Sequence, residues 1–129
     1  RSFCGAMLLT LPYPPSTNGL YRNARARNGK TIRVKTQKAQ AYQANAAQHV
    51  LAWFLEFGAP PLPPYRLTIV LYPPTARRQD VSNSIKVLED GVFSGLGQND
   101  RQVVEVRVRA EMADPKYPRA EVVLEHMEV

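Results

Sequence analysis

The chain has 129 residues and a formal net charge of +6, and we expect residues 1–129 to form one domain with a real hydrophobic core. Its single cysteine, Cys4, excludes an intrachain disulfide and a cysteine-based zinc cluster, which fits a reducing compartment. No apolar run approaches the roughly 20 residues that span a bilayer, and residues 1–6 lack the apolar core of a signal peptide, so Met7 is the expected natural start.

The first third of the chain is strongly basic. Residues 8–11 form an apolar run typical of a strand, and the prolines of residues 12–19 favour a stiff, extended connection. Residues 21–35 predict a basic hairpin, with Asn28-Gly29 as a strong two-residue turn signal. No acidic residue precedes Glu56, so this stretch predicts binding to a polyanion such as nucleic acid, although a generally basic surface is the alternative. The cations that we expect to contact DNA here are Arg22, Arg25, Arg27, Lys30, Arg33 and Lys35.

A long helix and a buried strand follow. Residues 37–57 are rich in Ala and Gln and lack Gly and Pro, which favours a helix. Helical spacing predicts that its core face consists of Ala39, Tyr42, Ala46, Val50, Trp53 and Phe54. After a proline-rich connector, residues 65–72 predict the clearest strand, because they are β-branched and largely apolar.

Residues 77–103 carry the polar groups that point to chemistry. Val81 to Val92 is the expected helix, with Asp80 at its start, and the three glycines 91, 95 and 97 are expected to end it. At about 100° per residue, one face of this helix is apolar, and the opposite face carries Asp80, Asn83, Lys86 and Asp90. Asp100 lies in the turn that follows, so a third carboxylate could return toward the polar face.

Two alternating segments, residues 103–109 and 119–126, predict strands that pair as an antiparallel hairpin, each with one buried face. Together these elements predict an α/β (α+β) fold. The expected architecture is a two-layer sandwich of a mixed β-sheet with two helices packed on one face. The expected chain order is strand, basic hairpin, helix, strand, helix, strand, strand.

The polar face of the second helix suggests a metal site. Carboxylates held close together repel unless a positive charge lies between them, and ligands that offer only oxygen suit Mg²⁺ or Mn²⁺. Lys86 on the same face could bind a phosphate or stabilise developing negative charge. Arg77 and Arg78 precede the helix, and we expect both to contact the DNA backbone. These features suggest metal-assisted attack on a phosphodiester. The alternative is an ordinary solvated face, on which Lys86 and Asp90 form an i,i+4 pair.

Three motifs in order give the chain a family resemblance. Residues 11–18, LPYPPSTN, match the opening L-P-x-P-P-S-x-N pattern of RusA-type Holliday junction resolvases, which are endodeoxyribonucleases. Residues 77–90 resemble the family's central R-R-x-D-φ-D-N-x-x-K-x-x-x-D, where φ is apolar, and residues 99–103 resemble its N-D-x-Q-V. The resemblance extends from Leu11 to about Glu125.

The resemblance implies a function in DNA recombination and repair. It implies a cytoplasmic homodimer, encoded by a bacterium or a phage, that binds four-way DNA junctions and resolves them by paired symmetric nicks. The implied cofactor is Mg²⁺, with Mn²⁺ as a substitute. The family's catalytic and metal-binding carboxylates fall on Asp80, Asp90 and Asp100, and its essential basic residue falls on Lys86, which is therefore also an expected catalytic residue.

One position departs from the family pattern, because Ser82 replaces the second acid of D-φ-D-N. Our hypothesis is that metal affinity falls while binding survives, with Ser82, Asn83 and Glu89 as weak ligands or outer contacts. The second reading is therefore a catalytically weakened or silent module that binds junctions without cutting them. A third reading is a generic basic α/β protein with solvated acids.

Overall fold

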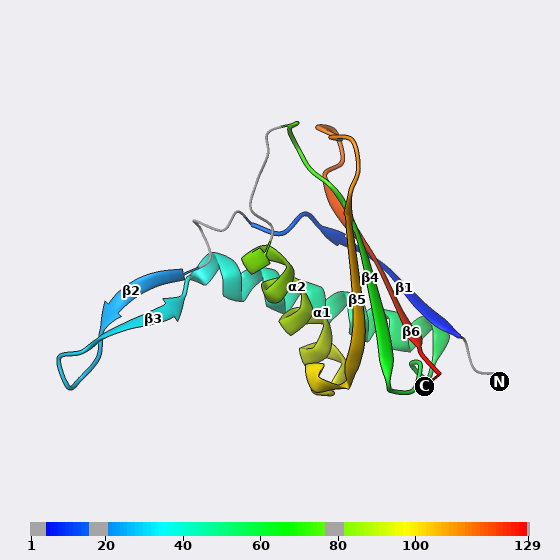
Figure 1. Ribbon diagram of the computed structural model, residues 1–129, viewed down its shortest axis with the longest axis horizontal. Helices are drawn as coiled ribbons and strands as arrows, with labels where there is room; N and C mark the ends of the chain where they lie inside the picture. Colours follow the sequence, from blue (N-terminus) through cyan, green and yellow to red (C-terminus); the bar gives the residue numbers. More distant parts are fainter. Residues whose placement is uncertain (1–4, 16–20, 77–81, 129) are drawn as a thin grey trace.

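The computed structural model describes residues 5–15, 21–76 and 82–128 (Figure 1). The elements follow the predicted order, with one additional 3₁₀ helix between the second α-helix and the strand that follows it. Their bounds are β1 Ala6–Pro12, β2 Tyr21–Arg25, β3 Thr31–Lys35, α1 Gln37–Phe57, β4 Tyr65–Tyr72, α2 Ser82–Leu96, the 3₁₀ helix η2 Asp100–Gln102, β5 Val103–Ala110 and β6 Arg119–His126.

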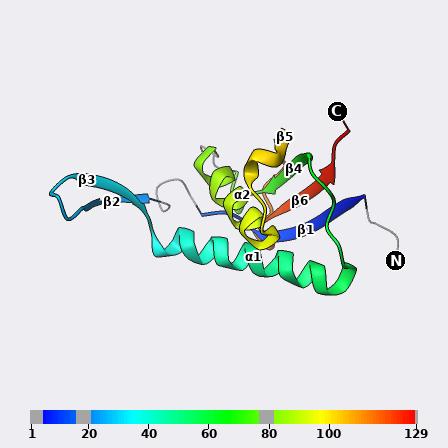
Figure 2. The same ribbon diagram turned by 90° about the horizontal axis from the view of Figure 1, so that it is seen from below.

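A four-stranded sheet in the order β1-β6-β4-β5 forms one layer, and α1 and α2 form the other (Figures 1 and 2). The sheet is mixed, because β4 runs parallel to β5 and antiparallel to β6, while β1 runs antiparallel to β6. The predicted two-layer α+β architecture with both helices on one face is confirmed. No helix in the described segments is both long and apolar enough to cross a membrane.

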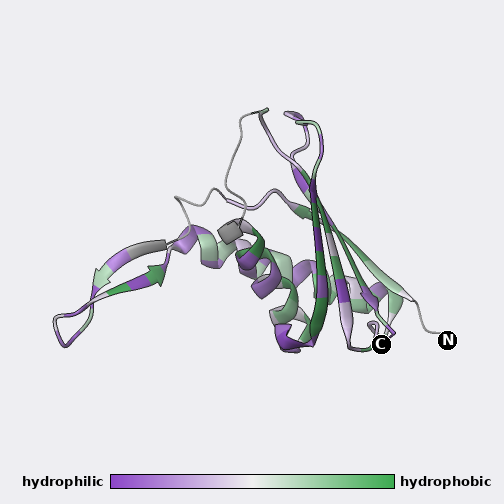
Figure 3. Ribbon diagram, viewed as in Figure 1, coloured by the Kyte–Doolittle hydropathy of each residue, from purple (hydrophilic) through white to green (hydrophobic). Residues whose placement is uncertain are grey.

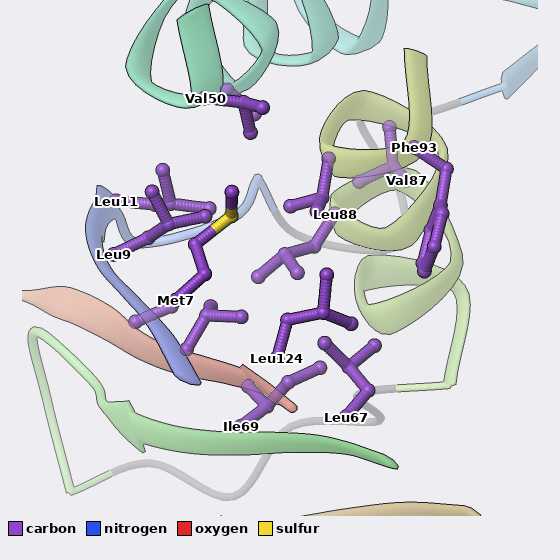
Figure 4. Close-up of a cluster of buried hydrophobic side chains, with 14 of the residues drawn as sticks. Met7, Leu9, Leu11, Val50, Leu67, Ile69, Val87, Leu88, Phe93 and Leu124 are labelled. Carbon is purple, nitrogen blue, oxygen red and sulfur yellow. The ribbon is translucent and has the colours of Figure 1, made fainter. Parts of the chain in front are cut away.

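The core lies between the sheet and the two helices. Alternate residues of β4 are buried, as the strand period of two requires, and Leu67 and Ile69 are fully buried on the helical side. Figure 4 shows side chains of the sheet meeting Val50 of α1 and Leu88 of α2. Of the six core residues predicted on α1, five are buried, and Phe54 is partly buried against the core. The helical and strand periodicities therefore located most of the core correctly.

The predicted hairpin between the last two strands is wrong. β4 lies between β5 and β6 in the sheet. It pairs with β5 in parallel, and α2 supplies the crossover connection that a parallel pair needs. Residues 111–118 then pass over the end of β4, where the amides of Glu111 and Asp114 donate to the carbonyls of Leu71 and Pro73. Local alternation identified both strands but could not reveal which strand each would pair with.

The expected end of the second helix is also wrong, because α2 continues through Gly91 and Gly95 to Leu96. Both glycines face α1. A Cβ at Gly91 would lie 2.8 Å from the Cβ of Ala46, and one at Gly95 would lie 2.8 Å from the carbonyl oxygen of Ala47. The two glycines let the helices approach closely, and only Gly97, with φ of +69°, has a conformation typical of a helix end.

The β2–β3 hairpin stands apart as its own two-stranded sheet and projects from the body beside the start of α1 (Figures 1 and 2). The predicted hairpin is confirmed, but the strands end at Arg25 and Thr31, so the connection is longer than two residues. The Gly29 amide donates to the Ala26 carbonyl, and φ of +84° at Gly29 completes the turn. Asn28-Gly29 thus lies in the turn, which is widened by one further pair between Ala26 and Lys30.

Candidate active site

Lys86 joins two carboxylates that are ten residues apart in the chain. It projects from α2 one turn before Asp90, and its Nζ lies 3.3 Å from Asp90 Oδ1 and 2.8 Å from Asp100 Oδ2. Asp100 is brought there because Gly97 ends α2 and the chain turns into η2, where the Asn99 side chain accepts from the Arg101 amide. Asp100 therefore lies beside the polar face of α2, as the sequence predicted.

The electrostatics of this cluster favour charged side chains. The hydrogen bond to Asp100 is the main cause that raises the pKa of Lys86, and contacts with Asp90 add to it despite some desolvation. The same hydrogen bond from Lys86 lowers the pKa of Asp100. The ammonium thus lies between two carboxylates as a positive group must if they are to remain ionised together.

Gln43 was not among the predicted site residues, yet α1 contributes it to the same cluster. Gln43 Nε2 donates to Asp90 Oδ2 at 3.4 Å, and Gln43 Oε1 accepts from Lys35 Nζ at 3.2 Å. Lys35 Nζ itself lies 3.6 Å from Asp90 Oδ2. Lys35 was predicted only as a DNA contact of the hairpin, whereas here it also links the base of the hairpin to a candidate catalytic acid.

An open hollow of about 360 Å³ lies beside these groups. The residues that line the hollow are Lys86, Asp90, Phe93, Ser94, Gln98, Asn99 and Asp100. Carboxylate, amide and hydroxyl groups thus surround a space that is accessible from solvent.

Glu89, predicted as an outer contact, is half-buried on α2, and desolvation by burial raises its pKa.

Several predicted site residues cannot be placed. Asp80 and the arginines 77 and 78 lie outside the described residues, and of Ser82 and Asn83 only the backbone at the start of α2 is described. Within the described ranges, no three His, Cys, Asp or Glu side chains are grouped so that they could hold a metal ion. The described part of the site is therefore a pair of carboxylates with a lysine between them.

Comparisons with known proteins identify the family. The sequence pattern of Endodeoxyribonuclease RusA matches residues 12–125. The chain is 34% identical over 101 residues, 78% of each chain, to the crossover junction endodeoxyribonucleases RusA of Escherichia coli K12 and of Enterobacteria phage 82. The chain belongs to the RusA family. A 2C-methyl-D-erythritol 2,4-cyclodiphosphate synthase from Plasmodium vivax aligns over 93% of this chain and 91% of its own at a TM-score of 0.34 and 11% identity.

The first RusA motif is anchored to both helices. The Tyr42 hydroxyl of α1 donates to the Pro12 carbonyl at 2.6 Å, and the Ser84 hydroxyl of α2 donates to the Pro15 carbonyl at 2.8 Å. Ser84 is buried, so this hydrogen bond satisfies a polar group inside the fold. The extended proline segment thereby approaches the beginning of the helix that carries Lys86.

The β2–β3 hairpin presents a row of cations. Arg25, Arg27, Lys30 and Arg33 are exposed, and Lys35 at its base is partly buried near Asp90. Arg22 lies in β2, where its side chain is not described. The predicted DNA-contact residues that the structure describes therefore extend from the candidate site along the projecting hairpin.

The two described carboxylates are of the ligand type that a hard divalent cation binds, although they do not by themselves form a complete metal site. Asp90 and Asp100 offer carboxylate oxygens on the border of a solvent-accessible hollow, and Gln98 and Asn99 add amide groups. These groups offer oxygen donors, and among the described residues no histidine or cysteine lines the hollow, so the donor type suits a hard divalent cation. The ammonium of Lys86 shows that a positive group is accommodated between the two acids.

Proposed function

We propose that this protein is a divalent-metal-dependent endodeoxyribonuclease that resolves four-way DNA junctions, with Mg²⁺ as its ion and Mn²⁺ as a substitute. The observation that carries the proposal is the convergence of Lys86, Asp90 and Asp100 on one open hollow at the base of a cationic hairpin. The proposal is supported by the similarity to proteins named crossover junction endodeoxyribonucleases.

The acids would hold the metal and the lysine would meet the phosphate. Asp90 and Asp100, together with Asp80, are the proposed ligands of an ion that activates water and neutralises charge. Lys86, kept charged by its carboxylate partners, would stabilise negative charge that develops on the scissile phosphate or the leaving oxygen. Gln43 would orient Asp90 by donating to its second oxygen.

The hairpin would bind the backbone of the junction arms. Its exposed cations suit phosphate contacts, which carry affinity without reading base sequence, so junction shape would determine specificity. Paired symmetric nicks require two sites, which is why we propose a homodimer. The proposed location is the cytoplasm of a bacterium or of a phage-infected cell.

A synthetic four-way junction tests the function. In Mg²⁺ the protein should nick two opposing strands, while Asp90→Asn and Asp100→Asn should bind the junction but cut at least roughly 100-fold more slowly. Asp114→Asn is the matched control, because Asp114 pairs with Arg119 in the connection after β5 and should cut normally. Full cutting by Asp90→Asn would overturn the proposed site.

Two further outcomes separate the alternatives. Junction binding without any nicking by the unmodified protein would favour a silent module, and failure to bind at moderate salt would favour a generic basic protein.

Metal titration of Ser82→Asp should show a lower Mg²⁺ requirement if the missing acid weakens the site. An unchanged requirement would show that Ser82 is not its weak point.

A further inference from the structure

The strand β5 forms an edge of the sheet with no partner on its outer side among the described residues. It pairs with β4 alone over its eight residues, and it contains neither proline nor glycine. A long regular edge exposes unpaired amides and carbonyls and favours pairing with another strand. One irregularity interrupts its pairing with β4, near Tyr65 and Arg66 at the start of the strand, so the rest of the edge is regular.

The side of β5 that faces the helical layer is apolar but poorly covered. Val104, Val106 and Val108 are 54%, 44% and 42% exposed. Their neighbours in register on β4, Leu67 and Ile69, are fully buried on the same face of the sheet. The predicted burial of one face of this strand is therefore wrong, because the core ends at β4 and leaves the valine stripe open.

The opposite side of β5 carries charges of both signs in alternation with the valines, as the banding along the strand in Figure 3 shows. Glu105 accepts from Arg66 at 3.1 Å and from Arg107 at 2.7 Å. Arg107 remains 59% exposed and Arg109 69% exposed in their side chains. The strand therefore has an open apolar stripe on one face. On the other face it has two exposed arginines and a Glu105 whose side chain is 29% exposed and pairs with Arg66 and Arg107.

We propose that β5 pairs antiparallel with β5 of a second copy, about a two-fold axis at Val106. In this register Val106 faces the partner's Val106, Val104 faces the partner's Val108, and Glu105 faces the partner's Arg107. Opposite charges and apolar side chains that lie directly across an antiparallel pair stabilise it. The sequence of β5 is therefore complementary to itself.

Neighbouring registers lack this complementarity. Moving the axis by one residue places either Glu105 opposite the partner's Glu105 or Arg107 opposite the partner's Arg107, and like charges directly opposed are destabilising. The other edge of the sheet, β1, ends at Pro12 and carries no charged residue between Ala6 and Pro12 that could select a register. Charge complementarity thus favours a second copy at β5 and a single register.

The pairing would join two sheets into one of eight strands with all four helices on the same side. Asp100 lies in η2 immediately before β5, so each candidate site would lie near the shared sheet and the two would be related by the axis. The inference deepens the proposed homodimer by naming its interface. It rests on β5 itself, so it is tested without DNA or metal.

Sedimentation velocity tests the interface directly. The unmodified protein should sediment as a dimer, and Val106→Lys should sediment as a monomer because two ammonium groups would oppose each other at the axis. Val106 is exposed, so the variant should retain the wild-type circular dichroism spectrum and the emission of Trp53. A monomeric unmodified protein, or a dimeric and folded Val106→Lys, would overturn the proposal.

The register has its own test by charge exchange. Arg107→Glu and Glu105→Arg should each weaken self-association, since each places like charges opposite one another across the axis. Mixed together, the two variants should form a heterodimer, because both pairs of facing charges are then opposite in sign. If the mixture associates no better than either variant alone, the antiparallel register about Val106 is wrong.

Cross-linking gives a second readout, because a disulfide also traps a dimer that associates weakly. In a Cys4→Ser background, Val106→Cys should form an intersubunit disulfide under mild oxidation, because directly opposed residues lie about 4.5–5.5 Å apart at Cα, within disulfide reach. Leu8→Cys is the control, since Leu8 is 66% exposed on the opposite edge of the sheet. Equal cross-linking by both variants would reject β5 as the interface.

Nicking of a junction by the unmodified protein is assayed separately, so failure of the proposed nuclease activity and failure of the proposed interface can be distinguished.

Discussion

Replacing Gly95 with alanine should destabilise the protein even though alanine is the better helix former. The new Cβ would lie 2.8 Å from the carbonyl oxygen of Ala47, 3.0 Å from its Cα and 2.8 Å from the Cβ of Val50. Two of these three atoms belong to the backbone of α1, so no change of rotamer relieves the contact. The two helices would have to separate.

The magnitude follows from two opposing effects. Alanine in place of glycine within a helix gains about 1 kcal/mol of helix propensity. Overpacking a buried contact costs about 1–3 kcal/mol, and contact with backbone atoms at this distance favours the upper half of that range. The expected net loss is about 1–2 kcal/mol, which lowers the Tm by roughly 4–8 °C for a domain of this size.

Urea unfolding followed by tryptophan fluorescence measures this loss. Trp53 is the single tryptophan and is only 7% exposed, so its emission reports on α1 and the core. Ser94→Ala is the matched control, because Ser94 is the exposed neighbour on the same helix and should change the stability by no more than about 0.5 kcal/mol. A Gly95→Ala protein that is at least as stable as the unmodified one would refute the close approach of the helices.

Gly91 offers a version of the experiment with a suppressor. Its added Cβ would lie 2.8 Å from the Cβ of Ala46 and 3.1 Å from the Cα of Gln43. Ala46→Gly removes the closer contact, so the double variant should be more stable than the sum of the two single effects predicts. Strict additivity would show that the two positions do not touch.

Three other outcomes follow from the charges. Burial raises the pKa of Glu89, so its ionisation opposes folding, and Glu89→Gln should be more stable than the unmodified protein at pH 7. This difference in the free energy of unfolding should shrink as the pH falls to the ordinary glutamate range. Urea unfolding that gives the same difference at pH 7 and pH 4 would argue against this reasoning. Lys86→Met should raise the pKa of Asp100 toward its ordinary value in an NMR titration, since Lys86 is the main cause of its depression, and an unmoved pKa would contradict the contact. Arg27→Ala should weaken junction binding and reduce its salt slope by about 0.9, whereas Lys116→Ala, an exposed cation after β5, should leave the slope unchanged.

Local patterns determined the elements of this protein and half of its candidate site. The alternation of β4 and the apolar stripe of α1 follow from backbone periods of two and 3.6 residues, which any stretch of sequence displays without reference to the rest. The same period placed Lys86 and Asp90 one turn apart on α2, where they form an ion pair. These inferences succeeded because the interactions involved are short in sequence.

Tertiary structure decided everything that depends on partners distant in the chain. The separation of β5 from β6 by β4 depends on how α2 crosses the sheet, and no local pattern encodes that path. Gly91 and Gly95 look like helix ends until α1 lies against them and requires the absence of a side chain. Likewise, Gln43 reaches Asp90 only because the close approach of the two helices brings together side chains that are 47 positions apart.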